Sequence, residues 1–176
     1  KTIFEGTWYE LSKHGFAKDM EFEAEKTGEG EASFVITDTE ETRRRYPYRF
    51  SFAMDYKLTE DGILIGYQVE NRDLKTMYYC LGAHPGFMCP MEEGERFEDF
   101  HLLFDQAETA DSHLLNPQGI ILHDGRKTML DGTGTLALDY QDFAQMDTLI
   151  FSMLRSGNVS LVHRETGRGV RLDFHE

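Results

Sequence analysis

Alternating apolar and polar positions are the dominant pattern in this chain. Between residues 46 and 58 every second side chain is aromatic or aliphatic, and those between are mostly small, polar or charged. A period of two predicts a β-strand with one buried face. The turn sequence "TEDG" follows at residues 59–62, and the alternation resumes at residues 63–69. Together these segments predict an antiparallel hairpin.

Short apolar runs elsewhere predict further strands, at 32–37, 77–81, 100–104, 119–122, 135–138, 147–151, 158–163 and 169–174. Most are separated by turn sequences, namely "KTGEGE", "ENRD", "NPQG", "DGTG", "RSGN" and "ETGRG". Helical periodicity is limited to residues 139–146, where we expect one short turn. The pattern favours an all-β, mostly antiparallel sandwich with too many strands for a small barrel.

Length and charge narrow the range of architectures and partners. A chain of 176 residues is long enough for one sizeable core, so we expect a single domain over residues 1–176. The net charge of −14 argues against nucleic acid and anionic membranes, because phosphate groups bind to positive surfaces. A small neutral ligand suits this composition better.

The sequence shows no leader peptide with a cleavage site and no apolar run of membrane-spanning length. It does not begin with Met, so we expect residues to be missing before Lys1. Cys80 and Cys89 are the two cysteines; they form no disulfide framework and suit a reducing compartment. We therefore expect a cytoplasmic protein.

The seven histidines have different surroundings along the chain. Those within or beside expected strands and charged residues are expected to face solvent: His101, His163 and His175. Two others, His113 and His123, are expected in polar loops without a recognisable partner. The remaining two, His14 in "KHGFAKD" and His84 in "GAHPGF", each lie beside an aromatic residue in a short glycine-containing element. Loops of this kind often carry functional groups on a rigid β scaffold.

Each of these two histidines has a purely structural interpretation. His84 could cap a turn in which Pro85 sets the backbone and Gly86 supplies a positive φ. His14 could belong to a similar turn, with Phe16 as a core anchor. Imidazole titrates near neutral pH, however, so two histidines that converge on one pocket could donate a proton and polarise a substrate.

A metal site is the next alternative for His84. Cys80, His84 and Cys89 form the pattern C-x3-H-x4-C, whereas a structural zinc site requires four ligands. Cys80 also follows two tyrosines in an expected buried strand, where a thiol acts as a small apolar side chain. We therefore expect no metal. No phosphate-binding loop or dinucleotide fingerprint is present in the sequence either. No helix start precedes Cys89 to activate it as a nucleophile.

The two histidine elements resemble a known family. "HGFAKD" followed by "EFE", and "GAHPGF" followed by "CPMEEGERFED", are similar to two elements of the aldose 1-epimerase (galactose mutarotase-like) family, in its LacX-type branch. The resemblance extends from the first residues to the last. It implies a large antiparallel β-sandwich, the galactose mutarotase-like supersandwich. It also implies an isomerase that interconverts the α and β anomers of a free hexose such as galactose or glucose, without metal or cofactor.

The resemblance also implies roles for individual residues. His84 corresponds to the general acid at the ring oxygen of the sugar, and His14 to a histidine that contacts the substrate. Asp147, in "MDTLIF", is the best match to an aspartate that binds sugar hydroxyls. Phe87 could line the pocket or simply pack in the core.

The family's catalytic base is a glutamate in a C-terminal segment that this sequence does not contain, and Glu176 lies in a different context. The resemblance therefore implies an incomplete portion of the sandwich, without its N- and C-terminal parts and without its base. The oligomeric state is not predicted.

Two other functions remain open. The first is a hexose-6-phosphate 1-epimerase, because relatives that act on phosphosugars share an HGFAR-like element; here Lys18 replaces the arginine. The one basic cluster, residues 43–45, could bind a phosphate, although a solvated turn before Tyr46 is the favoured interpretation. The second is a carbohydrate-binding module without catalytic activity.

Overall fold

Strands β5 (Phe50–Leu58) and β6 (Ile63–Asn71) form the predicted hairpin, and they pair antiparallel in one uninterrupted register. The N–H of Thr59 donates a hydrogen bond to the carbonyl oxygen of Gly62 (2.9 Å) and closes the predicted turn. This part of the prediction is confirmed. The register is uninterrupted because, with a period of two, a slip by one residue would move every apolar side chain to the other face of the sheet.

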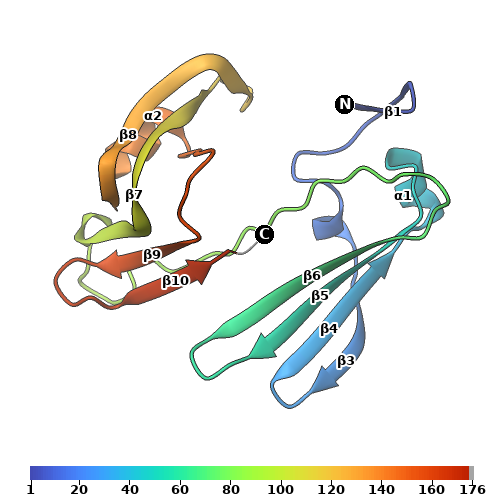
Figure 1. Cartoon of the computed structure of the whole chain (residues 1–176), viewed down its shortest axis with the longest axis horizontal. Helices are drawn as coiled ribbons and strands as arrows, with labels where there is room; N and C mark the ends of the chain where they lie inside the picture. The colour runs from blue at the N-terminus through green and yellow to red at the C-terminus, as the bar shows by residue number, and fades with distance from the viewer. Residues whose placement is uncertain (175–176) are drawn as a thin grey trace. The chain divides into compact units, whose positions relative to one another are not determined.

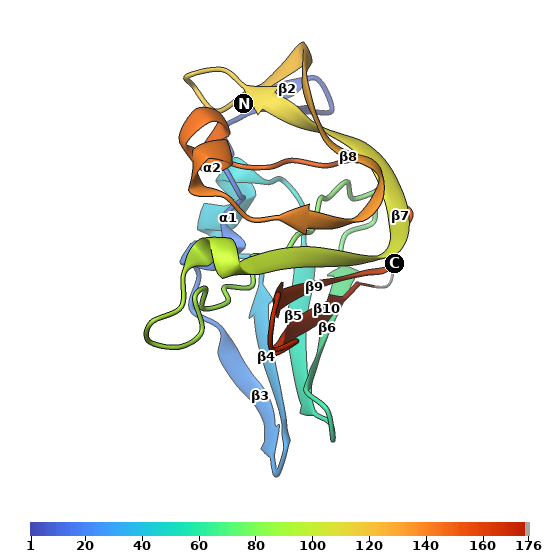
Figure 2. The same cartoon turned by 90° about the vertical axis from the view of Figure 1, so that its left-hand side faces the viewer.

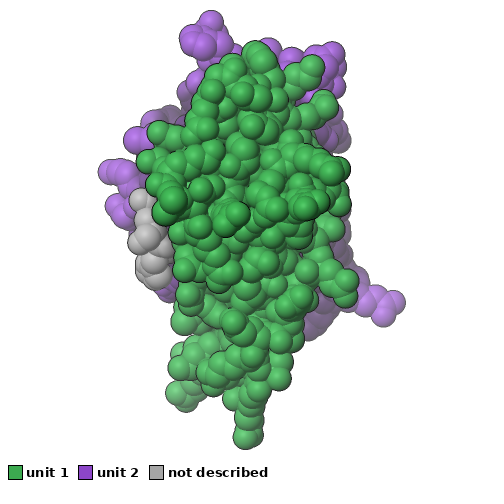
Figure 3. Space-filling view, turned by 90° about the vertical axis from the view of Figure 1, so that its right-hand side faces the viewer, with its two compact units in different colours: residues 1–84 green, residues 85–176 purple. Residues whose placement is uncertain are grey.

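The computed structural model describes residues 1–174, which fall into two compact units, residues 1–84 and residues from 85 onward (Figure 3). In the first unit a four-stranded sheet has the order β3-β4-β5-β6 (Figure 1). The strand predicted at 32–37 is confirmed as β4. The strands of this unit that precede the hairpin are β1 (Thr2–Phe4), β2 (Thr7–Tyr9), β3 (Glu23–Gly28) and β4 (Glu31–Thr37).

The core of the first unit lies on one face of this sheet, at the end nearest the start of β5. Its buried members come mainly from the alternating segment: Ile36, Tyr46, Tyr48, Phe50 and Phe52. Phe4 packs edge-on against both tyrosines, with ring centroids 5.4–5.5 Å apart. Edge-to-face aromatic pairs of this kind stabilise a core beyond the area that they bury.

The alternation continues further than the strand. Residues 46–49 are not part of β5, because α1 (Glu40–Arg45) ends here and Tyr46 N–H donates to the Thr42 carbonyl oxygen (2.7 Å). Pro47 lacks an N–H for the ladder, and the chain turns around it. The expected solvated turn at residues 43–45 is therefore wrong: these residues form the last turn of a helix.

The second unit contains a sheet in the order β10-β9-β7-β8. Its strands are β7 (Phe100–Leu115), β8 (Ile121–Ala137), β9 (Asn158–His163) and β10 (Gly169–Asp173). The strands predicted at 158–163 and 169–174 are confirmed, and those at 100–104, 119–122 and 135–138 overlap two longer strands. β7 and β8 bend strongly (Figure 2), and several register shifts interrupt their pairing.

The sequence "DGTG" lies inside β8 rather than in a turn. Gly132 has a φ of +66°, and its N–H donates to the Thr109 hydroxyl oxygen (3.1 Å). Glycine supplies this positive φ without steric cost, so it permits a bulge in a continuing strand. Glycine is common in turns, but Gly132 instead lies at a bulge inside the strand β8.

Two predicted strands are absent from the structure, and the predicted helical turn is present. The apolar runs at 77–81 and 147–151 are extended or irregular, because neither has a ladder partner among residues 1–174. Helix α2 (Tyr140–Met146) confirms the turn expected at 139–146. No helix in the described part of the chain has the length and apolar character needed to cross a bilayer.

The expected solvent exposure of His163 is wrong. Its side chain is buried, its ring packs edge-on against Phe100 at 5.1 Å, and its Nδ1 accepts from the N–H groups of Glu165 and Thr166 (3.2 and 3.3 Å). Alternation along β9 could not show that the following turn would fold back onto this ring. His175 lies outside the described residues.

Three other expectations also fail. His113 lies in β7, not in a loop, and bonds the Ser152 hydroxyl at 2.9 Å. His123 lies in β8 beside the Asp124 carboxylate at 2.7 Å. Cys80 is exposed rather than buried, because its segment is not a strand.

A buried carboxylate holds the chain after α2 against β7. Glu108 Oε1 accepts hydrogen bonds from Arg155 N–H (2.9 Å), Ser156 N–H (2.8 Å) and the Ser156 hydroxyl (2.6 Å). The hydroxyl of Ser156, together with these N–H groups, lowers the pKa of Glu108 against the opposing effect of burial. Hydrogen bonds to a buried charge contribute about 1.5–3 kcal/mol each, so this residue anchors the segment.

We expect Glu108→Gln to loosen this segment, because the amide replaces a charged acceptor by a neutral one. The amides of Arg155 and Ser156 should exchange with deuterium about 10-fold faster or more at pH 7. The folded pKa of Glu108 is lowered, so its stabilisation exists above the unfolded value of about 4.3 and is lost as the pH falls through the folded value. The difference between the two proteins should therefore shrink in acid.

Glu165→Gln is the matched control, because Glu165 is an exposed glutamate in the turn between β9 and β10. Its exchange rates should equal those of the unchanged protein. Equal rates for the Glu108 variant would contradict the anchoring role.

Candidate active site

His14 lies in a tight turn with an unusual backbone. Its φ is +66° and that of Gly15 is +71°, and Gly15 N–H donates to the Ser12 carbonyl oxygen (3.1 Å). The Ser12 hydroxyl closes the same turn by donating to the Gly15 carbonyl oxygen (2.6 Å). A positive φ at a residue other than glycine is uncommon and often marks a functional position. The turn leaves the His14 side chain exposed.

Phe16 fixes this turn to the core of the first unit. Its ring lies 5.8 Å from both Tyr46 and Phe50, centroid to centroid. The 3-10 helix η1 (Ala17–Asp19) follows at once, and the Lys18 ammonium pairs with the Asp19 carboxylate at 2.6 Å. The expected role of Phe16 as a core anchor is therefore confirmed, and it places His14 at the edge of the core.

His84 lies at the end of an extended segment that the same core holds. The Tyr46 hydroxyl donates to the Tyr78 carbonyl oxygen at 2.7 Å, and Met77 packs against the core cluster. Burial raises the pKa of Tyr46 to about 12, so its hydroxyl stays protonated and remains a donor at neutral pH. The positive φ expected at Gly86 is not found; it occurs at His14 and Gly15 instead.

The two histidines meet. Their ring centroids lie 5.1 Å apart, with the planes at 73°, so one ring presents its edge to the other. Both side chains are exposed. Two imidazoles at this distance can contact one small ligand and donate or accept a proton.

Asp147 lies in the second unit, at the residue that ends α2, and is exposed. Its φ is +64° and its ψ −42°, and Thr148 N–H donates to the Met146 carbonyl oxygen (2.7 Å) across it. This is a γ-turn of the strained, rare kind. Strain of this type is known at functional positions, and the role of Asp147 stays a prediction.

Phe87 is 46% exposed, so it does not pack in a core. Its role in lining a pocket stays a prediction.

The loop that follows Phe87 is organised by Glu95. Its Oε2 accepts from the N–H groups of Met91 (3.1 Å) and Glu92 (2.9 Å), and its other oxygen pairs with the Arg168 guanidinium. Burial, with a smaller contribution from this carboxylate, raises the pKa of the Cys89 thiol. A protonated thiol is a poor nucleophile, in agreement with the low reactivity expected for Cys89.

No group of three or more His, Cys, Asp or Glu side chains in residues 1–174 is placed to hold a metal ion.

The sequence pointed to His14 and His84 as candidate site residues. It did not reveal Tyr46, whose ring contacts the segment of one histidine and whose hydroxyl bonds the segment of the other. Alternation indicated that Tyr46 would be buried. The partner of its hydroxyl, however, is a backbone carbonyl 32 residues away, which no local pattern reveals.

The family model described as aldose 1-epimerase matches residues 2–120. The plasmid-encoded protein LacX of Lactococcus lactis subsp. lactis is 34% identical over 168 residues, which cover 94% of this chain and 56% of LacX. The chain thus spans about half the length of the curated relatives it matches.

Two solved structures are similar. A galactose mutarotase related enzyme from Lactobacillus acidophilus has a TM-score of 0.84 and 31% identity, over 95% of this chain and 55% of its own. A galactose mutarotase-like protein from Lactobacillus casei has a TM-score of 0.75 and 24% identity, over 94% and 56%, and supports the fold alone. The all-β fold is therefore part of a galactose mutarotase-like β-sandwich, and the chain belongs to the aldose 1-epimerase family.

Proposed function

We propose that the complete protein is a mutarotase that interconverts the α and β anomers of a free hexose. The observation that carries this proposal is the edge-to-face pair of His14 and His84, placed 5.1 Å apart by a shared aromatic core. Membership of the aldose 1-epimerase family supports it independently.

The reaction requires two proton transfers at opposite sides of the anomeric centre. A base removes the proton of the C1 hydroxyl, the C1–O5 bond breaks, and an acid protonates the ring oxygen O5. Rotation about C1–C2 presents the other face of the aldehyde, and the reverse transfers close the ring. Groups that titrate near the working pH perform both steps most efficiently.

In this scheme His84 is the general acid at O5, and His14 contacts the sugar and supports its orientation. Asp147 would accept hydrogen bonds from ring hydroxyls, and Phe87 would offer an apolar surface to the ring. In the family that this sequence resembles, the base is a glutamate, and we find no counterpart to it among these residues. We assign it to the complete protein, since the chain spans only 56% of LacX, and expect this chain alone to be inactive.

We expect His84→Ala in the complete protein to lower kcat roughly 10²–10⁴-fold, because the variant cannot protonate O5. Polarimetry of freshly dissolved α-galactose or α-glucose measures the rate directly. His123→Ala is the matched control, since His123 is an almost fully exposed histidine paired only with its neighbour Asp124. If both variants equilibrate the anomers at the same rate, His84 is not the acid.

Tyr46→Phe tests how the histidine segments are positioned. The variant keeps the aromatic packing but loses the hydrogen bond to Tyr78, so His84 should be held less firmly. A hydrogen bond is worth about 0.5–1.5 kcal/mol, which corresponds to a decrease of about 2- to 10-fold in kcat of the complete protein. In the chain itself, proton NMR should show a weaker contact between the two imidazole rings.

Tyr48→Phe is the matched control for this experiment. Tyr48 is fully buried in the same cluster, but its hydroxyl has no hydrogen-bond partner among residues 1–174, so its removal breaks no hydrogen bond there. Its kcat and ring contact should remain unchanged. If the two variants behave alike, the Tyr46 hydrogen bond has no role in positioning.

The structure weakens the case for a hexose-6-phosphate substrate. In α1 the Arg43 guanidinium pairs with the Asp38 carboxylate and that of Arg45 with Glu41, so acidic neighbours already neutralise two of the three charges. A phosphate site would need these donors unoccupied.

We therefore expect kcat/KM for glucose to exceed that for glucose 6-phosphate at least about 10-fold in the complete protein. Parallel polarimetry of the two sugars makes the comparison. A preference for the phosphosugar that Arg43→Ala abolishes would favour the alternative function.

A further inference from the structure

The two imidazoles of the candidate site also have the spacing of a metal-binding pair. A zinc ion lies about 2.0–2.1 Å from a ligating imidazole nitrogen, and the centre of the ring lies about 1.2 Å further away. Two imidazoles at a tetrahedral angle around one zinc ion therefore have centroids about 5.2 Å apart, whereas a right angle gives about 4.5 Å. The centroids of His14 and His84 are 5.1 Å apart, which agrees with the tetrahedral arrangement.

One ring must turn before a nitrogen of each faces a shared ion. The rings meet edge to face, with their planes at 73°, so only one of them directs its edge into the space between the two. The centre of an imidazole lies close to the axis of its Cβ–Cγ bond, so rotation about χ2 redirects the nitrogens and keeps the spacing of the centroids. Both side chains are exposed, so solvent gives room for this rotation.

The backbone that carries each ring is already fixed. Hydrogen bonds close the turn of His14, and Phe16 joins this turn to the core of the first unit. The Tyr46 hydroxyl holds the segment that leads to His84. Ligands that are placed before binding lose little conformational freedom when an ion arrives, so the second imidazole adds to the affinity at low entropic cost.

The type and number of ligands favour zinc in a weak, open site. Neutral imidazole nitrogen binds zinc and other late first-row metals, whereas Mg²⁺ and Ca²⁺ prefer oxygen ligands. No third His, Cys, Asp or Glu side chain among residues 1–174 joins the pair to complete a set of ligands. Water would fill the remaining positions, and such open zinc sites accept exchangeable ligands. We therefore expect reversible binding rather than a structural zinc site.

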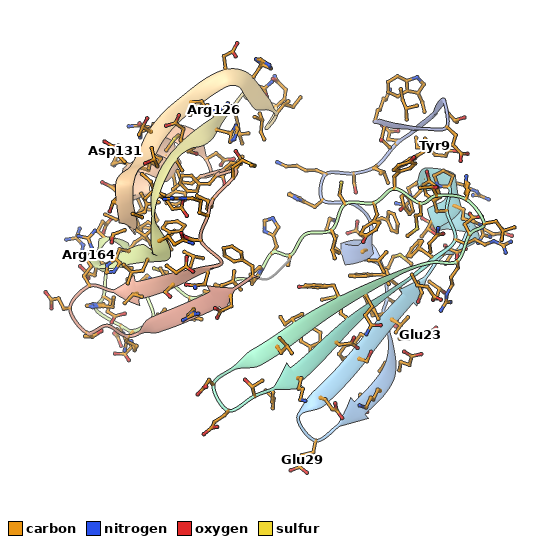
Figure 4. The ribbon with its side chains drawn as sticks, in the orientation of Figure 1. Tyr9, Glu23, Glu29, Arg126, Asp131 and Arg164 are labelled. Atoms are coloured by element: carbon orange, nitrogen blue, oxygen red, sulfur yellow. The ribbon has the colours of Figure 1, made fainter. Side chains whose placement is uncertain are left out.

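The charge of the chain attracts cations to this surface. Acidic side chains such as Glu23 extend into solvent (Figure 4), and the net charge of −14 raises the local concentration of cations. Lys13 and Lys18 flank His14 in the sequence and oppose this effect. The Lys18 ammonium, however, pairs with the Asp19 carboxylate at 2.6 Å, so one of these two positive charges is neutralised.

We propose that His14 and His84 together bind one zinc ion, and that this ion inhibits the reaction proposed above. A nitrogen that ligates zinc carries no proton, so His84 cannot protonate O5 through the nitrogen that holds the ion. The zinc site rests on the geometry of the pair, whereas the inhibition rests on the proposed function.

Isothermal titration calorimetry of the complete protein with Zn²⁺, in a buffer that does not bind zinc and without sugar, tests the site. His84→Ala and His14→Asn should each raise Kd at least about 10-fold, because only one imidazole remains. Asparagine is chosen at position 14 because it tolerates the φ of +66°. His123→Ala is the matched control, since it removes an exposed histidine outside the pair and should leave Kd unchanged. Proton NMR should show zinc shifting the imidazole signals of both His14 and His84.

Three results would overturn the zinc site: no binding by the unchanged protein, an unchanged Kd in either pair variant, and NMR shifts confined to one of the two rings. Far-UV circular dichroism verifies that the variants retain their sheets. The calorimetry decides the zinc site even if the protein has no mutarotase activity.

Polarimetry with added Zn²⁺ tests the inhibition separately. Zinc should slow the equilibration of α-galactose by the complete protein, with an inhibition constant equal to the Kd for zinc. Binding without inhibition would overturn the inhibitory role and the assignment of His84 as the acid, while the zinc site would stand.

Discussion

The side chain of Tyr46 is the point on which the candidate site depends. Its ring holds Phe16, and therefore the turn that carries His14, while its hydroxyl holds the carbonyl oxygen of Tyr78 in the segment that leads to His84. Two loops far apart in sequence are thus fixed by opposite parts of one residue. Because burial raises the pKa of Tyr46 to about 12, its hydroxyl stays protonated and remains a donor to this carbonyl at neutral pH.

The same core explains where the candidate site lies in the first unit. Phe4, Phe16 and Met20 cover the end of the sheet near the start of β5, and there the alternating residues are buried and the histidines are placed. At the opposite end of the same face the alternating residues Leu58 and Ile63 are exposed.

Carboxylates take the place of regular pairing where the chain leaves its sheets. Glu108 accepts three hydrogen bonds from Arg155 and Ser156, in a predicted turn, and Glu95 binds two backbone N–H groups of the loop after Phe87. Buried backbone donors need acceptors, and an ionised side chain supplies them where no neighbouring strand does. Sequence patterns do not reveal such partners. In the run at 147–151, which was wrongly predicted as a strand, the Ile150 N–H likewise donates to a side chain, the Ser112 hydroxyl (3.0 Å).

The sequence by itself determined the hairpin of β5 and β6, the all-β class and the two histidine elements, because periods of two and short glycine turns are local properties. It could not determine the pairing of distant segments: the apolar run at 77–81 has no ladder partner, and His163 is buried by a turn that folds back on it. Only the tertiary structure decided that His14 and His84 meet, since their contact depends on a hydrogen bond and ring packing between residues far apart in the chain.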